Sequence, residues 1–523
     1  MDRPRAEHAP RNVGTTGTEE RKMLRISPLF SDGAVLCRGK ELRVFGEADD
    51  GARVRCELMD EKDRLLARGD GIAVKGKFLI LLPPQEAGTG RRLIVSDGRE
   101  SVCSMDISVG EVYLAGGQSN MEMELRSAAE GLGLIAVHVN PLVRYFNVPK
   151  HAYFCEEREN AWRNARWQAI GPGRGQDISA AAYFFAMKLQ RELQVPVGVV
   201  DCYWGGSSVL NWMPEEWLRR TGKGTRELEA YAERTKGISP EESIRREKAF
   251  QATLDEWNGR AADYRTKHPD CPWEDVERAV GPCPWDPPEG PASPFRPAGL
   301  YATMVEPLTP LALTGILYYQ GEADATGPDC EYDVTMMSLI DLWRSAFREE
   351  KLPFLFVQLP MWIDKGAEDS GNWPVLRMCQ SAVRDRMRNT GMICLIDQGE
   401  YGNIHPANKR VVGERLYELA KRVIYGMPGE VSPRIRSRRI ERSMMTLTTD
   451  QPLMSRDGKE PALLEMAGAD GRFVPARAMI EGPMLHLTAP GVEYPLHVRY
   501  AWTDYGKVNL FGGNGLPLEP FAF

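Results

Sequence analysis

The sequence predicts an α/β protein with a parallel sheet flanked by helices and with β-rich regions at both ends of the chain. Residues 109–428 alternate short apolar runs with longer stretches of helical periodicity, which is typical of repeated strand–helix units. Residues 23–108 and 429–523 instead contain short β-prone runs separated by Gly, Pro and Asp. The 523 residues are too many for one hydrophobic core, so several domains are expected.

Composition excludes some classes of function. Hydrophobic residues make up 42% and charged residues 27% of the chain, as in ordinary globular proteins. The formal net charge is −7, without a long block of like charge, which argues against nucleic acid as a partner. The one basic cluster, "RIRSRRIER" at 434–442, is interpreted as the solvated face of a strand.

The termini and the cysteines bear on location and cofactors. Residues 1–22 are polar and lack an apolar core, so we expect a disordered tail, no signal peptide and a cytoplasmic protein. No run approaches 18 apolar residues, so no membrane span is expected. The ten cysteines form no CxxC pair, which argues against a zinc site. Cys271 and Cys283 flank a Pro/Trp-rich loop and allow a local bridge, but free thiols are favoured.

The N-terminal region, 23–108, is predicted to be a small β-sandwich-like domain. Its strands are expected at 41–48, 53–60, 77–84 and 91–97. The C-terminal region, 429–523, is predicted to be a second β-rich domain, with runs such as "MMTLTT" and "LHVRYAW".

The central region, 109–428, is predicted to carry the sheet. Strands are expected at 111–117, 195–206, 313–324, 352–360 and 391–400, and helices at 119–131, 178–194, 332–350, 375–389 and 406–426. Asp177 or Ser179 lies near the start of the second helix, and Pro406 near the start of the last. An insertion at 215–297 contains a charged helix and a Pro/Gly-rich loop, and we expect it to overhang the site.

Four polar clusters follow the predicted strands at their carboxyl ends, where ligands bind in open parallel sheets. They are Ser119 in "GGQSNM", Gly205–Ser208 in "WGGSS", Gln320–Glu322 in "YYQGEAD" and His405 in "GNIHP". Segments so far apart in the sequence are therefore expected to meet at one rim.

The chemistry that such a rim supports is acyl transfer. Ser119 would act as the nucleophile and His405 as its base. The backbone N–H groups of Ser119 and Gly206 and the side-chain amide of Gln320 would form the oxyanion hole. Each feature also has a bland explanation, such as helix capping for Ser119 or a tight turn for the glycines. The residues two before and two after Ser119 are Gly117 and Met121, so the GxSxG nucleophile elbow is absent.

The four motifs together resemble the sialate O-acetylesterase family of SGNH-type carbohydrate esterases. The resemblance extends to "SPLFSDGAVLCRGKELRVFGEADDGARV", "RPAGLYATMVEPL" and the C-terminal "LHVRYAWTDYGKVNLFGGNGLPLEPFAF", and so covers nearly the whole chain after residue 23. It implies an SGNH-hydrolase-like sheet and a serine esterase without metal or cofactor. It also implies Ser119 and His405 as the catalytic pair, with Ser119, Gly206 and Gln320 around the oxyanion.

Two departures from the family pattern concern the base and one further segment. SGNH hydrolases usually carry an aspartate three residues before the histidine, where this chain has Gly402, and Asn403 is uncharged where relatives often have aspartate. His405 is then oriented by Glu400, by Asp397, or by a backbone carbonyl in a Ser–His dyad. The second departure is Ala302–Thr303, where relatives often show asparagine.

The predicted function is a carbohydrate O-acetylesterase that acts on an acetylated sugar or oligosaccharide through an acetyl-enzyme. Glu322 is expected to anchor its loop or to meet a sugar hydroxyl. Trp204, Trp212 and the tryptophans of the insertion are candidates for a face that stacks on the sugar, although burial in the core is the commoner fate. The alternatives are an acetyl-xylan or other hemicellulose esterase on the same scaffold, and a non-catalytic carbohydrate-binding homologue.

Overall fold

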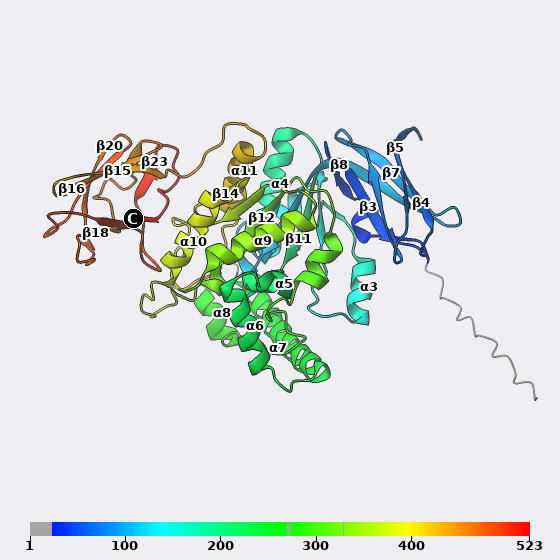
Figure 1. Cartoon of the computed structure of the whole chain (residues 1–523), viewed down its shortest axis with the longest axis horizontal. Helices are drawn as coiled ribbons and strands as arrows, with labels where there is room; N and C mark the ends of the chain where they lie inside the picture. The colour runs from blue at the N-terminus through cyan, green and yellow to red at the C-terminus, as the bar shows by residue number, and fades with distance from the viewer. Residues whose placement is uncertain (1–22, 269–270, 272, 328) are drawn as a thin grey trace, which may run out of the picture.

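The computed structural model describes residues 23–268, 271, 273–327 and 329–523. The tail predicted at 1–22 lies outside these residues. The chain forms three parts in a row, with the α/β part between an N-terminal and a C-terminal β-rich part (Figure 1). This arrangement confirms the predicted fold class.

The N-terminal part contains two groups of strands. A three-stranded antiparallel sheet has the order β1–β3–β6, and β4 pairs with both β5 and β7. The strands are β1 (Arg25–Ile26), β3 (Leu42–Glu47), β4 (Arg53–Met59), β5 (Leu65–Ile72), β6 (Lys77–Leu82) and β7 (Gly88–Ser96). The four predicted strands are present, but β5 was missed because Gly69, Asp70 and Gly71 interrupt its pattern.

One long strand joins the N-terminal part to the central sheet. β8 (Ser101–Gly117) pairs antiparallel with β7 along its first half. Its second half lies at the centre of the α/β sheet, parallel to β11 and β12. The short β2 (Val35–Cys37) also pairs with it. The predicted domain boundary at residue 108 therefore falls inside a continuous strand.

The central sheet has the order β10–β9–β11–β8–β12–β13–β14, and all neighbours are parallel except β10 and β9. Burial of entire strands, such as β11, explains their continuous apolar sequences. The strands are β9 (Asn140–Asn147), β10 (Gln168–Ile170), β11 (Val197–Tyr203), β12 (Gly315–Tyr319), β13 (Phe354–Val357) and β14 (Thr390–Ile393). The flanking helices are α3 (Glu156–Asn164), α4 (Ala180–Leu193), α9 (Tyr332–Ala346), α10 (Asn372–Arg386) and α11 (Arg410–Val423). Ser179 caps α4, as one of the two predicted candidates, by accepting a hydrogen bond from the N–H of Ala182.

The prediction of a single helix at 119–131 is wrong. The segment forms α1 (Ser119–Glu122), a 3₁₀ turn (Leu125–Ser127) and α2 (Gly131–Val137). The N–H groups of Leu125 and Arg126 donate to the carbonyls of Ile178 and Gln176 instead of to a continuous helix. Tertiary hydrogen bonds thus override the local helical pattern.

The insertion lies at the lower edge of the molecule in Figure 1. It contains α5 (Glu215–Leu218), α6 (Gly222–Arg234), α7 (Pro240–Lys267) and α8 (Trp273–Val280). The long charged helix predicted there is α7. All ten cysteines, Cys271 and Cys283 included, are free thiols.

The C-terminal part consists of three small antiparallel sheets. Their orders are β15–β16–β21–β20, β19–β18–β22–β24 and β17–β23. The strands are β15 (Ile435–Glu441), β16 (Met444–Thr449), β17 (Leu453–Ser455), β18 (Leu464–Ala467), β19 (Val474–Pro475), β20 (Arg477–Glu481), β21 (Met484–Thr488), β22 (His497–Tyr500), β23 (Leu510–Gly512) and β24 (Phe521–Ala522). The basic cluster forms β15, whose side chains are nearly all exposed, as predicted.

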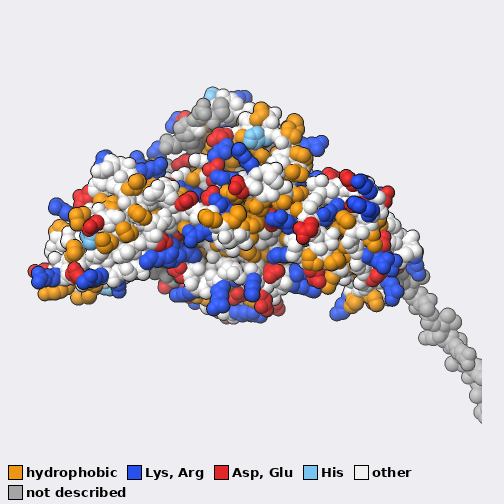
Figure 2. Space-filling model, turned by 90° about the horizontal axis from the view of Figure 1, so that it is seen from above, with side chains coloured by type: hydrophobic (Ala, Val, Ile, Leu, Met, Phe, Trp, Pro, Cys, Tyr) orange, Lys and Arg blue, Asp and Glu red, His pale blue; other side chains and the backbone are white. Residues whose placement is uncertain are grey.

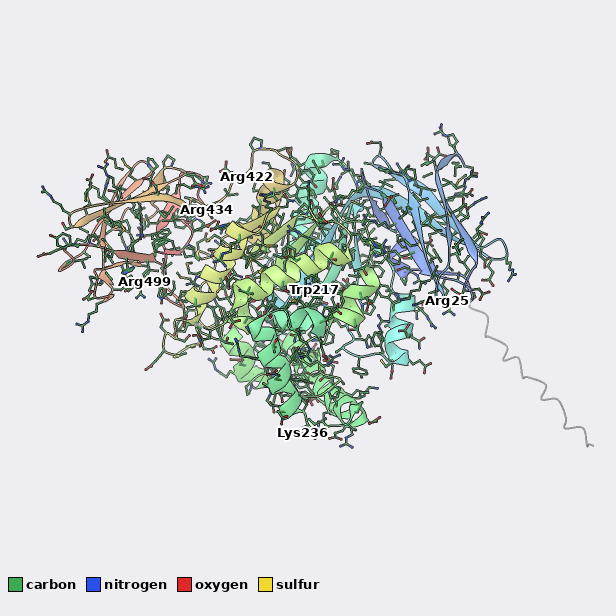
Figure 3. The ribbon with its side chains drawn as sticks, viewed as in Figure 1. Arg25, Trp217, Lys236, Arg422, Arg434 and Arg499 are labelled. Atoms are coloured by element: carbon green, nitrogen blue, oxygen red, sulfur yellow. The ribbon has the colours of Figure 1, made fainter. Side chains whose placement is uncertain are left out.

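Basic and acidic side chains are interspersed over the face seen in Figure 2. Among the described residues, no helix is long and apolar enough to cross a bilayer. The side chain of Arg434 lies where the C-terminal sheets meet the α/β part (Figure 3), and it pairs with Asp385 of α10.

Candidate active site

The structure brings Ser119 and His405 together. The Oγ of Ser119 lies 2.7 Å from Nε2 of His405, within hydrogen-bond distance. Ser119 is the first residue of α1, directly after β8, and His405 lies on the loop between β14 and α11. Gln118 occupies the N-cap position of α1, and no side chain caps the helix. Ser119 therefore does not serve as a helix cap. The pair has the geometry of a nucleophile and its base.

The Gly205–Gly206 turn lies beside Ser119. A Cβ placed on Gly205 would be 3.4 Å from the Cβ of Ser119, and Gly205 donates its N–H to the carboxylate of Glu122. Gly206 has a φ of +75°, which favours glycine. Within the described part of the chain, no hydrogen bond uses the backbone N–H of Ser119 or of Gly206 as a donor. Both groups therefore remain available to an oxyanion.

Gln320 lies close by, but its amide is engaged. Its Nε2 donates to Asp324 at 2.7 Å and lies 3.2 Å from acceptors on Gln118 and Ser207. Its Oε1 accepts a hydrogen bond from the hydroxyl of Tyr332. The side chain is thus a buried brace between the turn after β12 and the Gly206–Ser207 turn. It can donate to an oxyanion only if it gives up one of these bonds.

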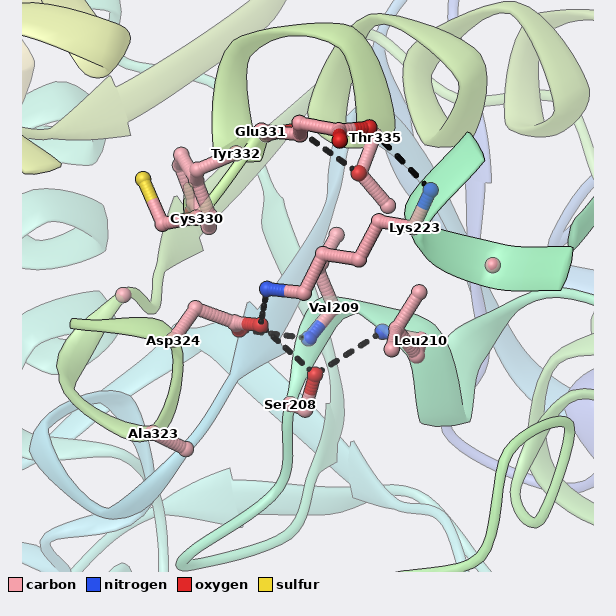
Figure 4. Close-up of polar contacts among 12 residues, drawn as sticks. Ser208, Val209, Leu210, Lys223, Ala323, Asp324, Cys330, Glu331, Tyr332 and Thr335 are labelled. Atoms are coloured by element: carbon pink, nitrogen blue, oxygen red, sulfur yellow. Dashed lines mark hydrogen bonds and ion pairs between the residues drawn. The ribbon is translucent and has the colours of Figure 1, made fainter. Parts of the chain in front are cut away.

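Asp324 organises the turn after β11 and was not predicted. Its carboxylate accepts hydrogen bonds from the Oγ of Ser208, the N–H of Val209 and the Nζ of Lys223, as Figure 4 shows. Asp324 is buried, so these charge-assisted bonds fix the turn that carries Gly206. Its position two residues after Glu322 in "YYQGEAD" was the available signal.

Among the residues that the structure describes, no carboxylate is hydrogen-bonded to the His405 ring. Within the described residues, the ring makes one hydrogen bond, to Ser119. Both oxygens of Asp397 accept from Arg415. Glu400 instead accepts from the amide of Asn403, whose oxygen accepts from the backbone N–H of His405. Glu400 therefore acts on the loop and not on the imidazole.

The backbone around His405 is held by a buried polar cluster of Asn120, Glu322 and Lys409. Asn120 follows the nucleophile and donates to the carbonyl of Ile404 at 2.9 Å and to Glu322 at 2.6 Å. Lys409 donates to the amide oxygen of Asn120 and to the carbonyl of Pro406. The carbonyls on both sides of His405 are thus tied to the residue next to Ser119. Glu322 anchors this cluster, the first of its two predicted roles.

Burial and nearby cations set the protonation of the base. Desolvation, together with the positive charges of Lys409 and Arg265, lowers the pKa of His405 to about 4. Burial also lowers the pKa of Lys409 to about 7 and raises that of Glu322. A depressed pKa keeps the imidazole neutral near pH 7, which is the form that accepts the Ser119 proton.

The remaining sequence candidates make no hydrogen bond to Ser119 or His405 within the described residues. Trp212 is fully buried and donates its indole N–H to the Oγ of Ser207, so it belongs to the core. Trp204 is half-buried, with the ammonium of Lys150 5.7 Å from its ring centroid. Thr303 is buried and its carbonyl accepts from Arg158. Across the described residues, no cluster of three or more His, Cys, Asp or Glu side chains could hold a metal.

Comparisons with known proteins identify relatives among carbohydrate esterases. Residues 292–419 match the family model described as "Carbohydrate esterase, sialic acid-specific acetylesterase". The chain is 26% identical to the sialate O-acetylesterase of Rattus norvegicus, covering 92% of this chain and 90% of the relative. The enzyme of Mus musculus is also 26% identical, over 91% of this chain and 90% of its own.

A solved structure is similar over nearly the entire fold. A carbohydrate acetylesterase from Xanthomonas citri superimposes with a TM-score of 0.75 and 28% identity, covering 95% of this chain and 99% of the other. The chain is a hydrolase of carboxylic esters. The resemblance predicted from the four motifs is confirmed, and so is the predicted class of enzyme.

Proposed function

We propose that this esterase removes acetyl groups from sugar hydroxyls through an acetyl-enzyme on Ser119. The observation that carries the proposal is the 2.7 Å contact between the Oγ of Ser119 and the Nε2 of His405. The free N–H groups of Ser119 and Gly206 lie beside it. The similarity to sialate O-acetylesterases and to a carbohydrate acetylesterase supports acetylated sugars as the substrate class.

In the first half-reaction, the Oγ of Ser119 attacks the acetyl carbonyl while Nε2 of His405 takes the hydroxyl proton. The oxyanion accepts hydrogen bonds from the N–H groups of Ser119 and Gly206, and Gln320 braces the turn. The bond from the carbonyl carbon to the sugar oxygen then breaks. His405 passes its proton to that oxygen, and the sugar alcohol leaves.

In the second half-reaction, water attacks the acetyl-Ser119 ester and gives its proton to His405. Collapse of the tetrahedral intermediate releases acetate and returns the proton to Ser119. Within the described part of the chain, no carboxylate is hydrogen-bonded to the ring to share the positive charge that His405 carries in each transition state. The polar cluster of Asn120, Glu322 and Lys409 fixes the ring's position instead, so the proposed machinery is a dyad.

Replacing Ser119 with Ala tests the proposal. We expect the loss of at least about a thousandfold in kcat for an aryl acetate, as for other serine nucleophiles. Circular dichroism and thermal unfolding should match the wild type. An organophosphonate should label the wild type at Ser119 and leave the variant unlabelled. Full activity in Ser119→Ala, or no labelling of the wild type, would contradict the mechanism.

The choice of sugar is a separate measurement. Acetate release from O-acetylated sialic acid and from acetylated xylo-oligosaccharide should be compared under the same conditions. A preference of more than about tenfold in kcat/KM for one of them assigns the substrate, since that ratio corresponds to about 1.4 kcal/mol in the transition state.

A further inference from the structure

We propose that Trp285 of the insertion forms a binding face for the sugar ring that carries the acetyl ester. The inference rests on the proposed function and adds a subsite to it. Trp285 lies on the Pro/Gly-rich loop between α8 and the segment before β12, far in sequence from Ser119 and His405.

The indole lies against the turn after β11 that carries Gly205 and Gly206, called here the catalytic turn. A Cβ placed on Gly206 would be 2.5 Å from Cζ2 and 2.9 Å from Cη2 of Trp285. The neighbouring Gly205 is in contact range of Ser119. A substrate whose acetyl carbonyl reaches the N–H of Gly206 must therefore place its next atoms beside this ring.

The indole remains open to solvent although its edges are supported. Phe250 of α7 packs edge-on at 6.0 Å between ring centroids, and Phe295 does so at 5.4 Å. Nevertheless 49% of Trp285 is exposed. This half-open aromatic surface above Gly206 is accessible to a ligand.

The loop that presents Trp285 is fixed to the catalytic turn and is not a loose flap. The buried amide of Asn211, at the end of that turn, donates to the carbonyls of Phe295 and Arg296 at 3.0 and 2.8 Å. Ala298 and Leu300 add backbone hydrogen bonds to Leu210 and Asn211. The position of the indole relative to Gly206 is therefore set before substrate arrives, which lowers the entropic cost of binding.

The exposed indole of Trp285 favours a sugar ring as its ligand over a flexible chain or an ion. An exposed indole offers a flat apolar surface that matches the C–H face of a pyranose, whose hydroxyls at the ring edge stay in water. Lys150, the cation beside Trp204, is engaged with the carboxylate of Glu122. The face therefore holds the sugar by apolar contact, while Ser119 and His405 act on its ester.

The experiment compares three substrates across the wild type and two variants. Wild type, Trp285→Ala and Tyr494→Ala are assayed with acetylated xylo-oligosaccharide, O-acetylated sialic acid and methyl acetate, which has no ring. Tyr494 is an exposed aromatic residue of the C-terminal part and serves as the matched control. We expect Trp285→Ala to raise KM about tenfold for whichever sugar the wild type uses, the size of effect that loss of one stacking contact gives. Its kinetics with methyl acetate should stay within about twofold of wild type, and Tyr494→Ala should match wild type on all substrates.

Three outcomes would overturn the proposal. An equal loss on methyl acetate and on the sugar would mean that Trp285 supports the turn and not the sugar. Unchanged sugar kinetics in Trp285→Ala would mean that the indole does not bind the sugar. Calorimetric binding of the sugar to Ser119→Ala and to Ser119→Ala/Trp285→Ala gives a readout independent of catalysis, and equal affinities would also contradict the proposal. A wild type that cleaves methyl acetate but no acetylated sugar would instead refute the proposed function.

Discussion

At the residue scale, Lys409 is the least expected member of the site. Sequence patterns give no reason to bury a lysine in "HPANKRVV", since lysine normally reaches solvent. The structure buries it almost completely and uses its Nζ to join the amide of Asn120 to the carbonyl of Pro406. The same ammonium is one of the charges that lower the pKa of His405. One side chain thus positions the base and, after burial itself, adds to the lowering of its pKa.

This double role predicts the pH dependence of activity. His405 must be neutral to accept the Ser119 proton, so kcat/KM falls as the pH drops through the pKa of the free enzyme. Because that pKa is about 4 instead of the ordinary 6.5, we expect activity to persist at pH 5 and to decline with a midpoint near 4. A pH profile of kcat/KM for methyl acetate checks it. A midpoint at 6 or above would contradict the assigned environment.

Replacing Lys409 with Met should move that midpoint upward. The substitution removes a positive charge near the imidazole but keeps a long apolar side chain. Among the described residues, the charged groups around His405 are Lys409 and Arg265, which lower its pKa, and the carboxylates of Glu322 and Glu400 that act on Lys409. We also expect kcat to fall about tenfold or more, because Asn120 and Pro406 lose their donor. Lys421→Met in the last turn of α11 is the control and should change neither quantity. If kcat fell but the midpoint of the pH profile did not move, Lys409 would have only a structural role.

At the scale of the element, the turn after β11 allows the role of its backbone in catalysis to be tested. Its two glycines have different reasons to be glycine. Gly206 has a positive φ and lies against Trp285, whereas a Cβ on Gly205 would make only ordinary contacts at 3.4 Å. We expect Gly206→Ala to lower kcat/KM about a hundredfold, in the range for loss of one oxyanion donor. Gly205→Ala should cost less than about tenfold, since it adds no backbone strain.

Adding Trp285→Ala to Gly206→Ala separates the two causes. Methyl acetate is the substrate, so sugar contacts play no part. Partial recovery would show that collision with the indole causes part of the loss, and no recovery would assign the loss to the backbone alone. Equal losses for Gly205→Ala and Gly206→Ala would refute the distinct roles of the two glycines.

The strands and helices also show which features of the fold and of the site the sequence could predict. Strands such as β11 and β12 were found because complete burial leaves an unmistakable apolar run, and the rule that ligands bind at strand ends then placed Ser119 and His405 at one rim. The helix at 119–131 failed because its backbone bonds to Gln176 and Ile178, which no local pattern reveals. Asp324 and Lys409 were missed for the same reason, since a polar residue in a loop motif looks alike whether it is buried or solvated.

At the scale of the whole molecule, the C-terminal part is built into the α/β part. Arg377 of α10 is completely buried and donates to the carbonyls of Ala501 and Thr503 at 3.0 and 2.6 Å. Asp504 in turn accepts from the N–H groups of Trp373 and Ser370 at the start of α10. The helix and the 501–504 segment therefore satisfy each other's polar groups.

This interlock predicts that the C-terminal part and the active site unfold together. We expect Arg377→Met to lower the free energy of unfolding by about 3 kcal/mol, because two buried carbonyls lose a charged donor. Arg436→Met, on the exposed β15, should stay within about 0.5 kcal/mol of wild type, since exposed ion pairs contribute little. Urea unfolding followed by circular dichroism and by residual esterase activity should give coincident transitions in the wild type and separated ones in Arg377→Met. If Arg377→Met were as stable as Arg436→Met, the buried guanidinium would not couple the parts. Their connection would then rest on apolar contacts such as those of Met361 and Ile396 with the C-terminal core.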